Sequence, residues 1–280
     1  MAQRKWKLPI TILNHCQFRK FKYHAKSSGY IDQNVIAFLG RFLPLFDSFC
    51  PINLAIDTHI DSYCILEFIL RNIWPMIARN IRGLTSRFFD RLRKFVPSIL
   101  NEFPFLRVVN SYDDFFTEFP ADDNAMASDG QSVAKWLFTP LPNNVPKVLQ
   151  CALNWDDGHL ASKIAALKAA FSSASSPANF IVVIRVHLWP FVASIVPFDQ
   201  TNESTCEHLA LKRIKKSNRF LLIRCPIARD ENKWTKWEEE AIGWEIYNQR
   251  NRIDIEIFNE DDIGDQLLDA TPGPSDQQQK

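Results

Sequence analysis

Cysteine and histidine are the residue types of this sequence that could carry nucleophilic chemistry, and each occurs six times. Cys206 and His208, for example, lie two positions apart. Residues with this spacing on a strand point to the same face, but the spacing does not aim an imidazole at a thiol as a general base requires. We therefore expect no catalytic pair. A cysteine- or metal-dependent α/β hydrolase stays an alternative, to be tested with ester, peptide and phosphate substrates.

Asp57, His59 and Asp61 combine the carboxylate and imidazole groups that bind metal ions. They follow a predicted strand, and no further ligands at metal spacing lie nearby in the sequence, so a solvated loop is the better interpretation. The sequence also lacks the G-x-S-x-G, G-x-x-x-x-G-K-[ST], G-x-G-x-x-G and H-E-x-x-H motifs. We predict a chain without enzyme activity, metal or cofactor.

Three tryptophans fall on one stripe of a predicted helix. Trp234, Trp237, Ala241 and Trp244 are spaced by three, four and three residues, and Asp230 precedes them as a predicted N-cap. Such a stripe could stack on sugars or bases. Beside a sheet it is more typical of a hydrophobic core, and we predict that role here.

Basic residues cluster near the N-terminus, although the net charge is only +1. Seven Lys and Arg and no acid lie between Arg4 and Lys26, and a second basic stretch runs from Arg71 to Lys94 with Asp90 as its one acid. Runs of this kind can contact phosphate. Because core-type residues alternate with them, amphipathic solvated faces are the preferred interpretation. Nucleic-acid binding through the basic N-terminus stays an alternative, which a steep salt dependence of binding would support.

The elements that must position these residues follow an α/β order. Strand candidates alternate with helical patterns at intervals of roughly 25–40 residues, which predicts parallel strands with right-handed crossovers. The fold class predicted for residues 1–178 is an irregular solenoid-like, leucine-rich-repeat-like βα layer. An ordinary open α/β sheet is the second interpretation. The strand candidates begin near Phe21, Ile52, Ile81, Leu106, Lys147 and Phe180.

Residues 179–269 change character, because strand candidates there lie close together. This spacing predicts an antiparallel segment with one Trp-rich helix, packed on the first part. The alternation of Ile253, Ile255 and Ile257 with acids predicts a last strand. Residues 270–280 are predicted to be a disordered tail. The other strand candidates of this part are Phe180–Val186, Ala193–Val196, His208–Ile214 and Phe220–Arg224, with Asp199–Ser204 as a turn.

The expected compartment is cytoplasmic or nuclear. The N-terminus has no uninterrupted apolar run of the kind that signal peptides contain. The longest uncharged run, from Val186 to Phe198, is too short to span a membrane, and we expect no membrane partner. The six cysteines lie far apart without a C-x-x-C pair, which is typical of reduced thiols.

Several long segments resemble a known family. They are "IVPFDQTN", "FLLIRCPIARDENKWTKWEEEA", "WEIYNQRNRIDIEIFNEDDIGDQLLD" and, nearer the N-terminus, "FDRLRKFVPSIL" and "FPADDNAMASDGQSVAKWLFTP". These segments are similar to the target-binding region of F-box proteins from plant-parasitic nematodes, and the resemblance covers nearly the whole chain.

The resemblance implies a protein-recognition function. Proteins of this family carry an N-terminal F-box that docks on the Skp1 adaptor of a cullin–RING ubiquitin ligase, followed by a domain that captures targets. This sequence opens at the stretch that would follow an F-box, so we expect that the chain does not bind Skp1 itself. Its expected partner is a protein target of unknown identity, and its expected role is a non-enzymatic target-recognition module.

The loops that follow parallel strands emerge at one edge of a sheet, and this edge is the predicted partner-binding rim. Tyr112 and Trp155 are predicted as anchors of the target, with Asp57 and His59 at the margin. The same rim is expected to include Asp61, Thr85, Ser86, Asn110, Asn154 and Asp156.

Overall fold

The structure is a computed structural model. It describes residues 10–14, 21–22, 33–42, 51–58, 67–86, 99–114, 117–153, 160–187, 195–215, 217–249 and 251–257. Its strands are β1 (Ile10–Asn14), β2 (Phe21–Lys22), β3 (Ile52–Thr58), β4 (Ile81–Ser86), β5 (Val108–Asp114), β6 (Lys147–Leu153), β7 (Phe180–Val186), β8 (Phe198–Asn202), β9 (Glu207–Arg213), β10 (Arg219–Pro226) and β11 (Arg252–Ile257).

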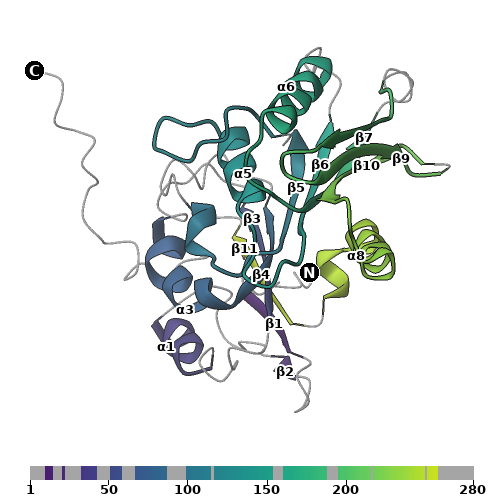
Figure 1. Cartoon of the computed structure of the whole chain (residues 1–280). Helices are drawn as coiled ribbons and strands as arrows, with labels where there is room; N and C mark the ends of the chain where they lie inside the picture. Colours follow the sequence, from purple (N-terminus) through teal and green to yellow (C-terminus); the bar gives the residue numbers. More distant parts are fainter. Residues whose placement is uncertain are drawn as a thin grey trace, which may run out of the picture.

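All of these strands belong to one 11-stranded sheet, in the order β2-β1-β11-β3-β4-β5-β6-β7-β10-β9-β8 (Figure 1). The five strands from β3 to β7 are parallel neighbours in chain order. Their buried runs explain this arrangement, since strands covered on both faces read as near-continuous apolar segments, as in Phe180–Val186. The predicted α/β class is therefore confirmed.

Helices cover both faces of the sheet. The crossover helices pack on one face, and α8 packs on the other (Figure 1). The helical elements are α1 (Gln33–Phe42), the π-helix η2 (Ile69–Ile73), α3 (Trp74–Ile77), the 3-10 helices η3 (Ala78–Asn80) and η4 (Ile99–Glu102), α5 (Asp129–Phe138), α6 (Leu160–Ser172), α8 (Glu231–Gly243) and the 3-10 helix η5 (Ile246–Asn248).

Two hydrophobic cores result. The larger one lies under the crossover helices and includes Leu54, Leu84, Val109, Leu149 and Val182 from successive strands. The smaller one lies under α8, where Val148, Ile181, Leu221, Ile223 and Trp234 meet. In β5, β6, β7 and β10, neighbouring residues therefore face different cores, as the period of a strand requires.

The helix α8 begins and packs as the sequence predicts. The carboxylate of Asp230 accepts a hydrogen bond from the backbone N–H of Lys233, which makes Asp230 the N-cap. Trp234 and Ala241 are buried against the smaller core, and Trp237 and Trp244 pack against it half-buried. The prediction that this stripe belongs to a core is confirmed for Trp234 and Ala241, whereas Trp237 and Trp244 lie at the edge of that core.

The strands differ from the prediction in three places. Strand β2, which begins at Phe21 and was expected among the parallel strands, pairs antiparallel with β1, whereas β7 pairs parallel with β6 as predicted and antiparallel with β10. The predicted turn at Asp199 lies in the edge strand β8, while the described part of the predicted strand Ala193–Val196 is not a strand. Strand β11 returns to the first part of the chain and lies between β1 and β3. The sheet is therefore continuous across residue 178.

The segment of β8 was predicted as a turn because its exposed positions are polar. The side chains of Asp199 and Thr201 face solvent at the sheet edge, and Asp and Thr residues in a polar stretch of sequence are typical of turns. No helix within the described ranges is long and apolar enough to cross a membrane.

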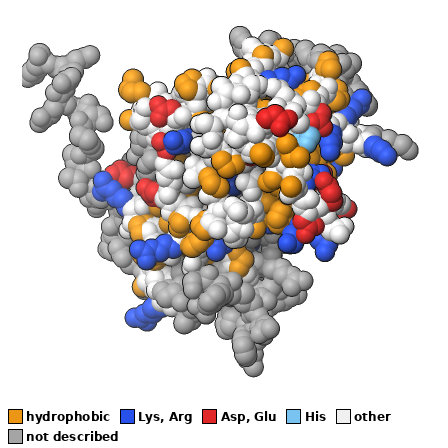
Figure 2. Space-filling model, in the orientation of Figure 1, with side chains coloured by type: hydrophobic (Ala, Val, Ile, Leu, Met, Phe, Trp, Pro, Cys, Tyr) orange, Lys and Arg blue, Asp and Glu red, His pale blue; other side chains and the backbone are white. Residues whose placement is uncertain are grey.

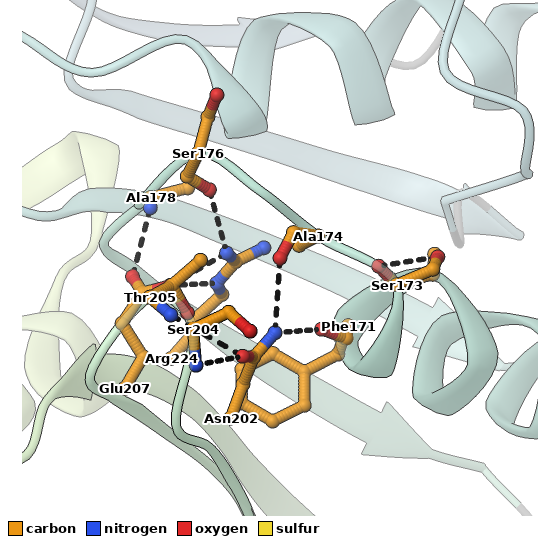
Figure 3. A network of polar contacts seen from close by, with 11 residues as sticks. Phe171, Ser173, Ala174, Ser176, Ala178, Asn202, Ser204, Thr205, Glu207 and Arg224 are labelled. Atoms are coloured by element: carbon orange, nitrogen blue, oxygen red, sulfur yellow. Dashed lines mark hydrogen bonds and ion pairs between the residues drawn. The ribbon is translucent and has the colours of Figure 1, made fainter.

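A polar network ties α6 to the far end of the sheet (Figure 3). Arg224 is fully buried, and its Nη2 donates to Oε2 of Glu207 at 2.6 Å and to the carbonyl oxygen of Ser176 at 3.0 Å. The other carboxylate oxygen of Glu207 accepts from the backbone N–H of Ala178 at 2.8 Å. The amide of Asn202 donates to the carbonyl oxygen of Phe171 at 2.6 Å. The network fixes the connection between α6 and β7 against β8, β9 and β10.

Candidate functional site

A pocket of about 680 Å³ opens between the C-terminal end of α8 and the amino ends of the parallel strands β3 to β6. This volume lies within the range of pockets that bind small-molecule ligands, roughly 300–1,000 Å³. On the face shown in Figure 2, apolar side chains lie exposed among acidic and basic ones over α8 and the neighbouring part of the sheet. The residues of the pocket that matter here are Asn53, Arg82, Phe105, Arg107, Asn143, Glu240, Trp244 and Gln249.

Gly83 allows Trp244 to form one wall of the pocket. A Cβ atom at Gly83 would lie 2.9 Å from Cζ2 of Trp244, and it would also collide with the side chain of Asn53. The indole ring can therefore lie on the backbone of β4 only because this position has no side chain. Trp244 is the C-cap of α8, so the same glycine determines where the helix ends over the sheet.

A register shift brings Arg82 into the pocket. Ile52 pairs with Ile81 and Asn53 pairs with Gly83, so Arg82 is the extra residue of β4 and has no partner residue on β3. Irregularities of this kind redirect a side chain that would otherwise follow the alternation of the strand. The guanidinium of Arg82 lies 4.1 Å from the ring centre of Phe105.

The two arginines of the pocket differ in their partners. Nη2 of Arg107 pairs with the carboxylate of Glu240 at 3.2 Å, and its Nε donates to the carbonyl oxygen of Pro146. Nη1 of Arg82 is buried and has no hydrogen-bond partner, and no described acid pairs with this side chain. Burial lowers the pKa of Arg82 from its usual value, which reflects the loss of water around an uncompensated cation.

Three carbonyl groups at the C-terminal end of α8 are already bonded within the chain. Gln150 donates to the carbonyl oxygens of Ala241 and Trp244 at 2.8 and 2.9 Å. Arg219 donates to the carbonyl oxygen of Ile242. Side chains of the sheet therefore satisfy these C-terminal carbonyl groups of the helix, and Arg219 adds a positive charge beside them.

A second, smaller cavity of about 170 Å³ contains a cysteine and a histidine that the sequence did not bring together. Cys225 lies opposite His208 across β9 and β10, and Nδ1 of His208 lies 3.1 Å from a carboxylate oxygen of Asp199. Burial raises the pKa of the Cys225 thiol, although the nearby Arg229 acts in the opposite direction. A nucleophilic cysteine needs a lowered pKa, so this arrangement does not favour thiolate chemistry.

The predicted partner-binding residues lie largely outside the described residues. The backbone of Asp57 belongs to β3 and that of Tyr112 to β5, but their side chains are not described, and neither His59 nor Trp155 is described at all. Their role in binding stays a prediction. Asp61, Asn154 and Asp156 also lie outside the described residues.

For three further residues of the predicted rim, the prediction is wrong. Thr85, Ser86 and Asn110 are buried inside β4 and β5 instead of lying in exposed loops. The strands extend further than their apolar runs indicate, because Thr85 and Asn110 continue across the sheet to Gln150 as a row of buried polar side chains. The observed pocket lies at the opposite, amino-terminal ends of the same strands.

The comparisons with protein-family models, with curated proteins and with solved structures found no match. The α/β fold and the pocket therefore rest on this chain's own sequence and structure, and the resemblance to nematode F-box proteins rests on the sequence segments that carry it.

Proposed function

We propose that the chain is a non-enzymatic protein-recognition module, the target-binding part of an F-box family protein, and that the pocket beside α8 receives part of the target. The observation that carries this proposal is the combination of an exposed aromatic ring and an arginine without a described acidic partner in one pocket. Phe105 is 42% exposed, and the guanidinium of Arg82 lies over its ring. Aromatic and arginine side chains are the ones that most often dominate binding energy at protein interfaces.

Two features of the fold support this role. The parallel order of β3 to β7, with crossover helices on one face, supports a βα layer in this part of the sheet, while α8 packs on the other face and leaves the pocket at its C-terminal end. The protonated state favoured for the Cys225 thiol argues against the hydrolase alternative at the one described cysteine that lies opposite a histidine.

Site-specific cross-linking tests the proposal. A photoreactive amino acid in place of Asn143, at the margin of the pocket, should capture a partner protein from an extract of the source organism. The same amino acid in place of Lys236, which is exposed on α8 away from the pocket, is the control. A partner captured from position 143 but not from position 236 is then identified and purified.

The purified partner provides the decisive measurement. Phe105→Ala should weaken its binding by about tenfold or more, the effect of losing an interface anchor worth at least ~1.4 kcal/mol. Met126→Ala removes an exposed apolar side chain outside the pocket and should leave the affinity unchanged. Equal affinity of wild type and Phe105→Ala would contradict the proposal, and so would turnover of ester, peptide or phosphate substrates by the purified chain.

A further inference from the structure

Among the described residues that line the pocket, the charges are unbalanced. Glu240 is the one acid of this described lining, and its carboxylate already pairs with Arg107. Arg82 has a buried Nη1 without a partner and no described acid beside it. A guanidinium offers its N–H donors in a planar fork that matches a carboxylate. Because Arg82 is partly exposed and lines the pocket without a described acid, this side chain favours an anionic group in a ligand.

The other side chains that line the pocket indicate which chemical group lies beside that anion in the ligand. Val108, Val148 and Leu141 are buried and apolar, and Phe105 and Trp244 add aromatic surface that is incompletely covered. Because the ring of Phe105 lies directly under the guanidinium of Arg82, an apolar group on this ring would lie next to an anion on Arg82. The two requirements therefore apply to neighbouring parts of one ligand.

We propose, on the basis of the proposed function, that the pocket binds an acidic peptide segment of the target in which a carboxylate adjoins a large apolar side chain. The carboxylate pairs with Arg82, and the apolar side chain packs between Phe105 and Trp244. The side-chain amides of Asn143 and Gln249 lie at the margin of the same pocket, where they can bond the peptide backbone.

The same residues favour a peptide over a nucleic acid. Nucleic-acid affinity comes largely from many phosphate contacts by Lys and Arg. The described pocket offers Arg82 as a cation not committed to an acid, over an apolar floor. One anion beside an apolar group suits an Asp or Glu next to Phe, Trp, Leu or Met in an extended peptide.

A peptide selection tests the inference. A phage-displayed library of random heptapeptides is selected on the immobilised full chain, in parallel with Arg82→Gln and with Arg79→Gln. Arg79 is exposed outside the pocket and three residues from Arg82, which makes it the matched control. Peptides enriched on the wild type and on Arg79→Gln, but not on Arg82→Gln, should carry Asp or Glu next to a large apolar residue.

A synthetic copy of the most enriched peptide, blocked at both ends, gives the quantitative result. Arg82→Gln should weaken its binding by about tenfold or more, and replacing the peptide's own acid by its amide should do the same. The amide peptide should then lose little more on Arg82→Gln, because both changes remove one interaction. Thermal melting of each variant establishes that it is folded.

Several outcomes would overturn the inference. These are an absence of enriched peptides, enriched peptides without an acid, and affinity that does not depend on Arg82. Binding of a fluorescein-labelled single-stranded oligonucleotide that is lost in Arg82→Gln, with no peptide binding, would assign the pocket to nucleic acid instead. If the cross-linked partner depends on Phe105 but not on Arg82, the proposed function stands and the acidic-peptide inference fails.

Discussion

Two arginines of the same sheet lie against phenylalanine rings, yet they end in opposite surroundings. Arg224 lies between Phe138 and Phe171, with its guanidinium 5.1 and 5.2 Å from the ring centres, and it pairs with the buried Glu207. Arg82 lies 4.1 Å from the ring of Phe105 and has no described acidic partner. The first cation is enclosed by the chain, and the second lines a pocket.

The difference shows how the chain distributes its charges. A charge removed from water needs an opposite charge and hydrogen bonds nearby, or the fold loses stability. Arg224 has its counter-charge and hydrogen bonds through Nε and Nη2 within the chain, although its Nη1 is also buried without a partner. Arg82 has no described acid and lines the pocket, where a ligand can supply the counter-charge. The Arg224 network thus stabilises the fold, and the pocket lined by Arg82 is the proposed site of binding.

The largest effect is expected at the enclosed arginine. Arg224→Met leaves the carboxylate of Glu207 buried without its partner, and should lower the free energy of unfolding by about 3–5 kcal/mol. Chemical denaturation of the purified variant measures this change. The double variant Arg224→Met, Glu207→Leu should recover much of the loss, because no uncompensated charge then remains. A single variant as stable as the wild type would remove the contrast with Arg82.

A second test compares the two ends of the tryptophan stripe. Trp234 is 4% exposed in the smaller core, whereas Trp244 is half-buried at the pocket. Trp234→Ala should lower the free energy of unfolding by about 3–4 kcal/mol, the usual result of emptying an aromatic core site. Trp244→Ala should cost clearly less, and should weaken the binding of the selected acidic peptide. Equal losses of stability at both positions, measured by urea denaturation, would show that the pocket wall is a core site.

Much of the fold could be predicted because local patterns determine it. The strands beginning at Ile52, Ile81, Lys147 and Phe180 are buried runs of apolar residues, and Asp230 with the tryptophan stripe specifies α8. Strand β11 was predicted as a strand, but its place beside β3 could not be predicted, because most of the chain lies between partners such as Asn53 and Arg252. Pairing over such distances depends on the packing of all the intervening elements.

The pocket left almost no signal in the sequence, for a related reason. Arg82 enters it through a register shift, and Trp244 can approach β4 closely because Gly83 has no side chain. The Arg-Gly pair is visible in the sequence, but its effect depends on the strand and the helix packed against it. The rim prediction followed the common rule that ligands bind at the carboxyl ends of parallel strands. In this chain the described pocket lies at their amino ends.

A third cation sharpens the comparison, because a lysine can lose its proton when it is buried and an arginine cannot. Nζ of Lys147 donates to the carbonyl oxygen of Trp136 at 2.6 Å, and burial lowers the pKa of Lys147 to about 8. In the unfolded chain the pKa of lysine is about 10.4. Between these values the unfolded state binds more protons than the folded state, so stability contributed through Lys147 should rise with pH.

The corresponding variant isolates this contribution. Between about pH 8 and 10.4 the wild type should gain on the order of 2 kcal/mol that Lys147→Met does not gain, allowing for partial screening by solvent. Lys135→Met, at an exposed position of α5, should follow the wild type. Urea denaturation across this pH range measures the difference. Parallel curves for wild type and Lys147→Met would show that Lys147 is charged in the folded protein up to the pH at which a free lysine titrates.

The smallest change in stability is expected at Arg82, and this variant tests the contrast between Arg82 and Arg224 most directly. Arg82→Gln removes a cation that gains no ion pair within the described chain and is partly desolvated, so the free energy of unfolding should change by no more than about 0.5 kcal/mol. The lost contact with Phe105 and the relief of an uncompensated charge act in opposite directions. Denaturation of this variant beside Arg79→Gln measures the balance. A loss of several kcal/mol would mean that Arg82 supports the fold as Arg224 does, and the pocket would then lack the spare cation that an acidic partner needs.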